Sequence, residues 1–374
     1  MEIPSLLDHF SELPDPRIDR QRRHELIDII TITICAVLGD CDTWTDIQEF
    51  AEIREDWFRK FLKLPNGIPS HDTLSRVFSL MSPEPFQQAF SNWVKTVQKV
   101  FDQEIVAIDG KCLRGSHDTA NGKAAIYMVS AWAESNKMVL GQVKTDEKSN
   151  EITAIPILLK ALELRGCIVT IDAAGCQKKI AQQIRNQGAD YVLALKGNQS
   201  NLHQDVADFF EMAGTAAFKD YQHAYFEEVD GGHGRVETRK YWIASDLTWL
   251  DNREQWCDLN LIGMVESERY QNGHVSKERR FFISSLSPDV ETFARAVRDH
   301  WGIENKLHWC LDVSFAEDKS RVRKGYGAQN LAVVRHITTN LLKQETSKKT
   351  RSLKTKRKMA SWSSDYLIKV LNYG

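Results

Sequence analysis

The sequence of 374 residues has little of what marks fibrous, disordered or disulfide-stabilised proteins. Its 20 Gly and 9 Pro are too few for a collagen-like or broadly disordered chain. Its 7 Cys are scattered and odd in number, and no two have Cys-x-x-Cys spacing. Neither a disulfide framework nor a zinc site is indicated, and a reducing compartment fits.

Long hydrophobic runs and a signal peptide are also missing. The longest apolar run, from Leu26 to Leu38, is too short to span a bilayer and contains Asp28. The first residues, Met-Glu-Ile-Pro-Ser, lack the basic and apolar regions of a signal peptide. We therefore expect a cytoplasmic protein with no membrane partner.

An excess of one charge is absent overall, since 49 Lys and Arg stand against 51 Asp and Glu for a net charge of −2. From Thr346 to the end, however, eight Lys or Arg stand against one Asp, so the residues before Thr346 carry a net −9. Residues 346–358 have little apolar content and are expected to be disordered by themselves. Such a basic end favours contact with a polyanion, and simple solvation is the alternative.

The hydrophobic fraction of 42% and the chain length predict a soluble globular protein of two or three domains. Apolar spacing in residues 1–100 predicts four helices, at 24–39, 42–64, 70–80 and 82–100. These helices form an N-terminal helical domain. Such a domain either carries a DNA-binding helix pair or serves for packing alone.

Strand patterns begin at residue 104. The predicted order is strands at 104–108, 124–133 and 138–145, a helix at 150–164, a strand at 167–171, a helix at 177–187 and a strand at 191–195. This order predicts an α/β fold, a mixed sheet flanked by helices on both faces. A β-rich insertion is predicted at about 200–287, with strands at 226–228, 236–243, 261–269 and 279–283 and a hairpin turn at 270–274. Helices are predicted to follow at 288–311 and 328–342. The core thus spans 101–345, and 346–374 form a basic C-terminal tail.

Two of the apolar strands end in an aspartate. Asp109 follows Ile-Val-Ala-Ile, and Asp172 follows Ile-Val-Thr-Ile. Strand ends present ligand groups in open sheets. These carboxylates lie side by side if the first and fourth strands are neighbours, as three antiparallel strands and a crossover helix would place them. Each aspartate taken alone could equally cap a turn, since Asp-Gly and Asp-Ala-Ala-Gly are good turn formers. Two strands that end in the same way favour a shared site.

A third acid, Glu304, lies in a helical pattern, where Glu304, His308 and Leu311 would share one face. Two Asp and one Glu brought together repel unless a cation neutralises them. Oxygen ligands of this kind suit Mg²⁺ or Mn²⁺. Two such ions activate water or a 3′-hydroxyl in phosphodiester chemistry. An exposed helix carboxylate is the alternative for Glu304 alone.

Several segments resemble bacterial insertion-sequence transposases with a DDE triad. They are Glu104–Ser116 with Ile-Asp-Gly-Lys-Cys-Leu-Arg-Gly-Ser, Thr170–Gln177, Tyr191–Gln199, His300–Val313 and the N-terminal Phe10–Arg17 and Leu26–Ala51. The chain is most similar to the H-repeat-associated transposase family found with Rhs elements, and the resemblance runs over nearly its whole length. It implies a ribonuclease-H-like core with a β-rich insertion before the last acid.

The resemblance implies that Asp109, Asp172 and Glu304 are the catalytic, metal-binding triad. The broader family pattern has Tyr and Arg seven and four residues before the Glu, and Lys seven residues after it. This sequence has Val297, His300 and Leu311 at those positions. The residues that contact phosphate near the triad must therefore come from elsewhere.

Candidate DNA-binding residues are chosen on chemical grounds, since Arg can fork onto phosphate oxygens. They are Lys111, Arg114, Lys196, Arg298, His308, Arg321 and Arg323. Ordinary solvation is the alternative for each, and it is expected for the nearby acids Asp312 and Asp318. Trp242, Trp249 and Trp256 in the insertion either stack on an unpaired base or pack in the core.

The resemblance implies a transposase that cuts double-stranded DNA at element ends and joins the freed 3′-hydroxyl to target DNA with two Mg²⁺ or Mn²⁺ ions. The need to handle two ends suggests a homodimer. Two alternatives remain open from the sequence. One is an inactive or repurposed DNA-binding relic of a transposase, and the other is a metal nuclease that cleaves without joining.

Overall fold

The computed structural model describes residues 5–99, 101–118, 122, 124–145, 151–219, 221–232, 235–271 and 274–373. The chain forms two compact units. The first unit contains Met1–Val100, Gly110–Lys148 and Glu304–Gly374, and the second contains Phe101–Asp109 and Ser149–Ile303. Each unit is described by itself below.

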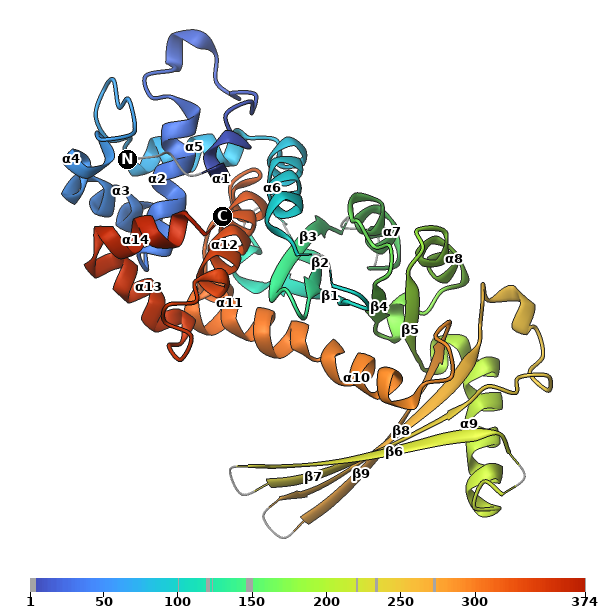
Figure 1. Cartoon of the computed structure of the whole chain (residues 1–374). Helices are drawn as coiled ribbons and strands as arrows, with labels where there is room; N and C mark the ends of the chain where they lie inside the picture. The colour runs from blue at the N-terminus through green and yellow to red at the C-terminus, as the bar shows by residue number, and fades with distance from the viewer. Residues whose placement is uncertain are drawn as a thin grey trace. The chain divides into compact units, whose positions relative to one another are not determined.

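The first unit is mainly helical. Its helices are α1 (Ser5–Asp8), α2 (Leu26–Leu38), α3 (Trp44–Ile53), α4 (Glu55–Phe58), α5 (His71–Leu80), α6 (Pro83–Val97), α11 (Trp309–Ser314), α12 (Gly327–Gln344), α13 (Leu353–Trp362) and α14 (Ser364–Leu371). Helix α12 contacts α2, α5 and α6, so the C-terminal part packs among the N-terminal helices (Figure 1). Strands β2 (Ile126–Ala133) and β3 (Met138–Lys144) pair antiparallel in this unit. The strand order is β3-β2-β1, where β1 is Ile105–Leu113.

The four predicted N-terminal helices are present, but the segment 42–64 is divided. Helix α3 ends at Ile53 and α4 begins at Glu55, with the backbone of Arg54 outside the helical region (φ −114°, ψ 17°). Across the break, Phe50 of α3 meets Phe58 of α4 edge-on, with ring centroids 6.5 Å apart. After it, Trp57, Phe58 and Phe61 pack on one another with ring centroids 4.8–5.9 Å apart. The predicted segment therefore forms two helices joined by aromatic packing.

The expected disorder of residues 346–358 is wrong, because helix α13 begins within this segment and buries two of its cations. Lys356 donates to the backbone oxygens of Leu342 (2.8 Å) and Glu345 (2.6 Å). Arg357 is fully buried and pairs with Asp40 (3.1 Å) and Asp42 (2.8 Å). Composition alone predicted a solvated tail, whereas tertiary carboxylates and carbonyls stabilise these buried cations.

The second unit contains an α/β core followed by a β-rich insertion. Its elements are the start of β1 (Ile105–Leu113), α7 (Glu151–Ala161), β4 (Ile168–Ile171), α8 (Lys178–Asn186), β5 (Asp190–Leu195), α9 (Ser200–Thr215), β6 (His223–Gly232), β7 (Arg235–Ala244), β8 (Leu261–Gln271), β9 (His274–Ser284) and α10 (Val290–His300). Its strand order is β1-β4-β5-β9-β8-β7-β6. Strands β1, β4 and β5 run parallel, and β5 pairs antiparallel with β9. The predicted α/β fold with a mixed sheet is confirmed.

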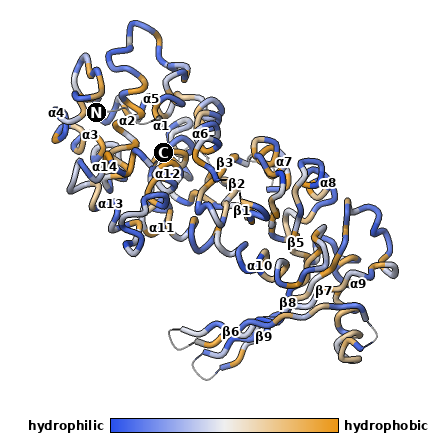
Figure 2. Tube along the Cα trace, viewed as in Figure 1, coloured by the Kyte–Doolittle hydropathy of each residue, from blue (hydrophilic) through white to orange (hydrophobic). Residues whose placement is uncertain are grey.

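The insertion strands β6 to β9 form an antiparallel meander that is longer than expected. Strand β6 covers His223–Gly232, where only 226–228 were predicted. Residues Leu261 to Val265, in the first half of β8, are buried. The residues after them, toward the hairpin that joins β8 to β9, are polar and more exposed (Figure 2). The predicted turn residues 272–273 lie outside the described residues, but β8 and β9 pair around them.

The second unit's core lies between this sheet and α10. Phe293 of α10 is fully buried and meets Phe282 edge-on at 5.7 Å. Val297, from the same helix, belongs to the same cluster. Within the described residues, no helix is both long and apolar enough to cross a membrane.

Candidate metal centre

The register of β1 and β4 brings Asp109 and Asp172 together. The strands pair in parallel, with Ile108 opposite Ile171. Asp109 directly follows Ile108, and Asp172 directly follows Ile171. Asp172 also caps the short turn that follows, accepting from the backbone N–H groups of Ala174 (3.1 Å) and Gly175 (3.4 Å). The turn-capping alternative is therefore present together with the shared site.

Glu151 is the third acid of this cluster, and the sequence analysis missed it. It is the first residue of α7, and one carboxylate oxygen from each of Asp109, Glu151 and Asp172 lies within 4.8 Å of the other two. All three side chains are half-buried. Among the described residues, this is the group of acids placed to hold a metal ion. In the sequence, the local feature of Glu151 was its position as an acid in the first turn of a helix. A carboxylate there is also explained by its favourable interaction with the helix dipole.

The electrostatics of the cluster favour a bound cation. Burial, followed by the charge of Asp172, raises the pKa of Glu151 above its usual range. Three carboxylates at this spacing repel one another, and a divalent cation removes that repulsion. Oxygen donors in a partly open site are what Mg²⁺ and Mn²⁺ prefer. The chemistry of the donor set therefore fits a divalent metal ion.

Two polar side chains from the loop after β5, the exposed Asn198 and the half-buried Gln199, contact the Asp172 loop. Asn198 donates its side-chain amide to the backbone oxygen of Ala173 (2.7 Å), and Gln199 donates to that of Cys176 (3.0 Å). The loop after β5 thereby fixes the loop after β4. These positioning contacts were not predicted from the sequence.

His300 ends α10 and lies beside the same strand. Its Nδ1 forms a hydrogen bond of 2.9 Å with the hydroxyl of Thr170 in β4. Burial lowers the pKa of His300 to about 4, although the charge of Asp172 acts in the opposite direction. The imidazole is therefore neutral at pH 7 and adds no positive charge for phosphate.

Glu304 is the first residue of the segment Glu304–Gly374, which belongs to the first unit. It is exposed, on a π-helical turn over Ile303–His308, which is not the α-helix that the sequence predicted. A π-helical turn pairs residues five apart and is frequent at functional sites. The expected common face is wrong, because Leu311 is buried while Glu304 is exposed. Its role as third triad member stays a prediction.

Of the predicted phosphate contacts, Lys111 is surrounded by acids within the first unit. Its Nζ lies 2.7 Å from Asp312, 3.2 Å from Glu317 and 3.3 Å from Asp318. Burial alone would lower the pKa of Lys111, but these charges raise it above its usual range. Asp312 and Asp318, expected to be solvated, are ion-paired instead. Arg114 nearby is 79% exposed, at 3.5 Å from Asp318.

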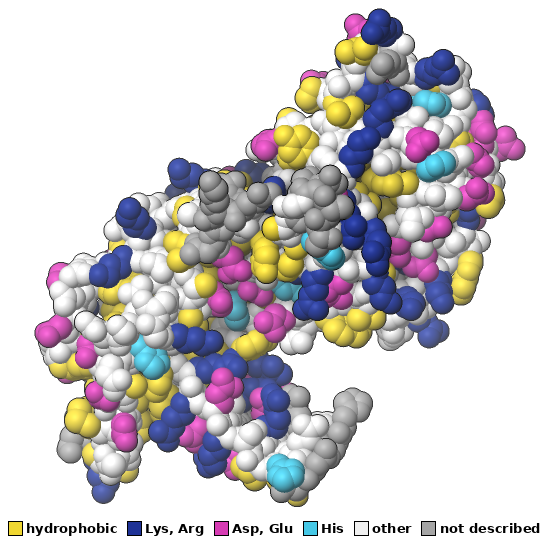
Figure 3. Space-filling model, turned by 180° about the vertical axis from the view of Figure 1, so that it is seen from behind, with side chains coloured by type: hydrophobic (Ala, Val, Ile, Leu, Met, Phe, Trp, Pro, Cys, Tyr) yellow, Lys and Arg dark blue, Asp and Glu magenta, His cyan; other side chains and the backbone are white. Residues whose placement is uncertain are grey.

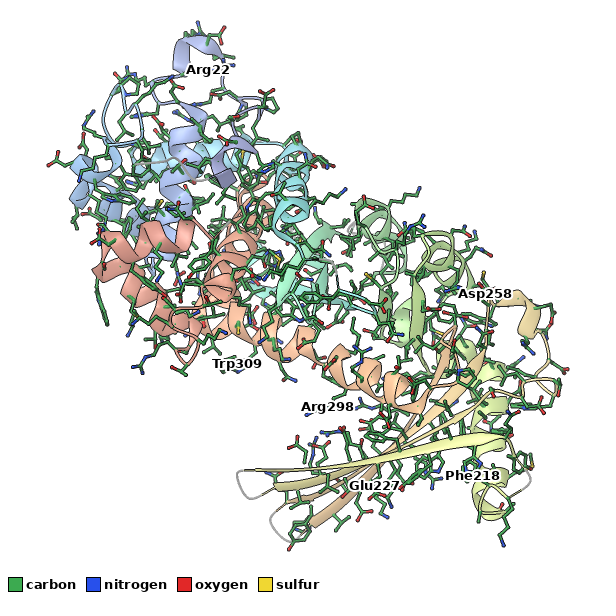
Figure 4. The ribbon with its side chains drawn as sticks, in the orientation of Figure 1. Arg22, Phe218, Glu227, Asp258, Arg298 and Trp309 are labelled. Atoms are coloured by element: carbon green, nitrogen blue, oxygen red, sulfur yellow. The ribbon has the colours of Figure 1, made fainter. Side chains whose placement is uncertain are left out.

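Two further candidates, His308 and Arg298, are a buried neutral ring and an ion-paired guanidinium. Burial, with the charge of Lys111 second, lowers the pKa of His308 to about 4, so its ring is neutral at pH 7. Arg298 on α10 is half-exposed and reaches β6, where it lies 3.2 Å from Asp230 (Figure 4). Lys196, by contrast, is exposed at the end of β5.

Arg321 and Arg323 follow α11 in the first unit. Arg321 is exposed, and Arg323 is half-buried and donates to the backbone oxygen of Gly115 (3.2 Å). The roles of all these cations in binding DNA stay predictions.

The three insertion tryptophans pack against protein aromatics. Trp256 is 5% exposed. Trp249 stacks on Phe209 at 4.8 Å with parallel rings, and Trp242 stacks on Phe218 at 6.0 Å. Core packing therefore accounts for Trp256, and Trp242 is half-buried against Phe218. Trp249 is 39% exposed, so base stacking stays a prediction for this residue.

Comparison with known proteins identifies two adjacent family matches. Residues 101–341 match the family model described as "Transposase DDE domain", and residues 7–94 match one described as "DDE_Tnp_1-associated". The chain is 42% identical to "Putative transposase YncI" of Escherichia coli O157:H7, over 99% of this chain and 95% of that protein. It is 39% identical to "H repeat-associated putative transposase YhhI" of Escherichia coli strain K12, over 99% and 98%.

Among solved structures, one similar chain is a piggyBac transposase in a synaptic complex with hairpin DNA. The likeness covers 97% of this chain and 78% of that chain, with a TM-score of 0.42 and 9% sequence identity.

Proposed function

This chain belongs to the DDE transposase family, and from that premise we propose that the acids of the second unit form the metal centre of an insertion-sequence transposase. The observation that carries the proposal is the cluster of Asp109, Glu151 and Asp172, which lies inside the matched DDE domain. Two of its three members are the aspartates that the family resemblance implies.

We propose that Asp109 and Asp172 bind Mg²⁺ or Mn²⁺ together with Glu304. Glu151 is the neighbouring carboxylate that the cluster adds. Two bound ions would activate a water or a 3′-hydroxyl and stabilise the leaving oxygen of the phosphodiester. The protein's own contribution is to hold the acids in position, as the amides of Asn198 and Gln199 do for the Asp172 loop. Fixed positions lower the barrier because little reorganisation is needed.

The proposed substrate is double-stranded DNA, at the element ends and at the target. The exposed cations Arg114, Lys196 and Arg321 are suited to neutralise phosphates. Figure 3 shows Lys and Arg side chains gathered in a band on one face of the first unit, which supports a polyanion partner. A homodimer that handles both ends, and a cytoplasmic location, complete the proposal.

The test is a cleavage and joining assay on DNA that carries the element ends, with Mg²⁺ present or removed. Asp109→Asn and Asp172→Asn are compared with the parent and with Asp251→Asn, which neutralises an exposed acid of the same unit. We expect joined products from the parent and the control only. Cleavage without joining in the parent would indicate a nuclease. End binding with no cleavage would indicate a DNA-binding relic.

A further inference from the structure

A basic segment of the first unit, Ser320–Tyr326, is held rigidly at both of its ends. At one end, a Cβ on Gly115 would lie 2.0 Å from the backbone oxygen of Ser320, so only glycine allows this approach. At the other end, Gly325 has φ +50°, and the Tyr326 N–H donates to the backbone oxygen of Ser79 (3.0 Å). The cations between these anchors therefore project from a fixed backbone.

This segment forms one wall of a pocket of about 510 Å³. The lining residues are Trp44, Ser75, Asp118 and the four residues 321–324, all within the first unit. The volume falls within the range of about 300–1,000 Å³ that is usual for ligand sites. The indole of Trp44 is half-buried and supported by Phe78, with ring centroids 5.2 Å apart. The pocket thus combines a fixed aromatic ring with a basic wall.

Two cations of this wall, Arg321 and Lys324, differ from the ion-paired cations described above. Lys111 and Arg298 have carboxylate partners, whereas the side chains of Arg321 and Lys324 are exposed and make no ion pair with the acids that the structure describes. Three cations against the single acid Asp118 give the lining a net positive charge. The site is therefore suited to an anionic group.

We propose that this pocket binds one unpaired nucleotide of the DNA substrate. Its base stacks on Trp44, and its phosphate lies against Arg321 and Lys324. Indole stacking needs an exposed base face, which base-paired DNA does not offer inside the duplex. The inference rests on the proposed function for the identity of the polymer as DNA.

The test measures binding of the full chain, by fluorescence anisotropy, to two labelled duplexes of equal length. One duplex is blunt, and the other ends in a single-stranded overhang. We expect Trp44→Ala to weaken binding of the overhang duplex roughly 5- to 150-fold and to leave blunt-duplex binding unchanged. Trp44→Phe keeps a stacking ring and should restore most of the affinity. Equal binding of the overhang by Trp44→Ala and the parent would overturn the proposal.

The cationic wall is tested with exposed residues, which the fold does not need. Arg321→Gln with Lys324→Gln should weaken overhang binding by about tenfold or more, whereas Lys60→Gln, at another exposed lysine of the same unit, should not. Tight binding of deoxyadenosine monophosphate alone, in competition with the overhang, would assign the pocket to a free nucleotide and overturn the assignment to DNA. Binding is measured without Mg²⁺ or Mn²⁺ and needs no strand cleavage, so a failure of DNA joining can be told apart from a failure of this site.

Discussion

Glu151, Asp109 and Asp172 carry like charges within 4.8 Å, so the metal-free protein bears a repulsion that a divalent ion removes. Glu151→Gln should therefore raise the metal-free free energy of unfolding by about 1 kcal/mol, or about 2–4 °C in melting temperature. It should also reduce the stabilisation that Mn²⁺ gives the parent. Thermal melts with and without Mn²⁺ measure both effects, and Asp251→Asn is the control.

The same cluster has a definite pH dependence. The pKa of Glu151 is higher in the folded than in the unfolded protein, so the folded state holds this proton more tightly. Without metal, its contribution to stability is therefore greatest at low pH and falls as the pH rises from about 4.3 through the folded pKa. This decline should be smaller in Glu151→Gln. An unchanged pH profile would mean that neither burial nor the charge of Asp172 raises the pKa of Glu151.

Lys111 and Arg114 are both predicted DNA contacts, yet their surroundings differ. The side chain of Lys111 is 10% exposed among three acids, and that of Arg114 is 79% exposed. Arg114→Gln should reduce the salt dependence of DNA affinity by about 0.9 in the log–log slope. Lys111→Gln should leave that slope unchanged and cost about 3 kcal/mol of stability, because buried Glu317 loses a partner. Anisotropy titrations at several salt concentrations and urea unfolding test the contrast.

At the scale of elements, one of the two buried cations of helix α13, Arg357, connects this helix to several other segments. Arg357 donates to the backbone oxygens of Val37 (3.0 Å) and Ser314, pairs with Asp40 and Asp42, and lies 4.3 Å above the ring of Phe315. Arg357→Met should lower the free energy of unfolding by about 3 kcal/mol. Its exposed neighbour gives the matched control, Lys358→Met, which should stay within about 0.5 kcal/mol of the parent. Equal urea midpoints for the two variants would contradict this packing.

The strands could be predicted from the sequence because buried strands consist of short runs of apolar residues. Runs such as Ile-Val-Ala-Ile before Asp109 and Ile-Val-Thr-Ile before Asp172 are apolar on both faces, as buried parallel strands require. Their adjacency followed from the crossover helix between them. The structure confirms both points through the register of Ile108 with Ile171.

Other features depend on contacts between distant residues and leave no local signal. Glu151 joins the acid cluster through the packing of α7, 42 positions after Asp109. Lys356 and Arg357 resemble a solvated basic run until their partners Glu345, Asp40 and Asp42 are placed around them. The π-helical turn at Glu304 interrupts a pattern that reads as one continuous helix. Each of these was missed or misassigned for that reason.

At the scale of the whole molecule, the chain carries both matched family regions, at 7–94 and 101–341. Its net charge of −2 gives no general attraction to DNA, so binding must depend on local groups of cations. We therefore propose that this transposase contacts DNA through exposed cations such as Arg114, Lys196 and Arg321, beside the acids of the proposed metal centre.

The most direct test of this account is the transposition frequency in cells. A selectable marker is placed between the terminal sequences that flank the gene, and the chain is supplied separately. We predict marker transfer with the parent and with Asp251→Asn, and a loss of about 1,000-fold or more with Asp109→Asn or Asp172→Asn. Transfer at the parent's frequency in either of these two variants would contradict the assignment of the metal centre.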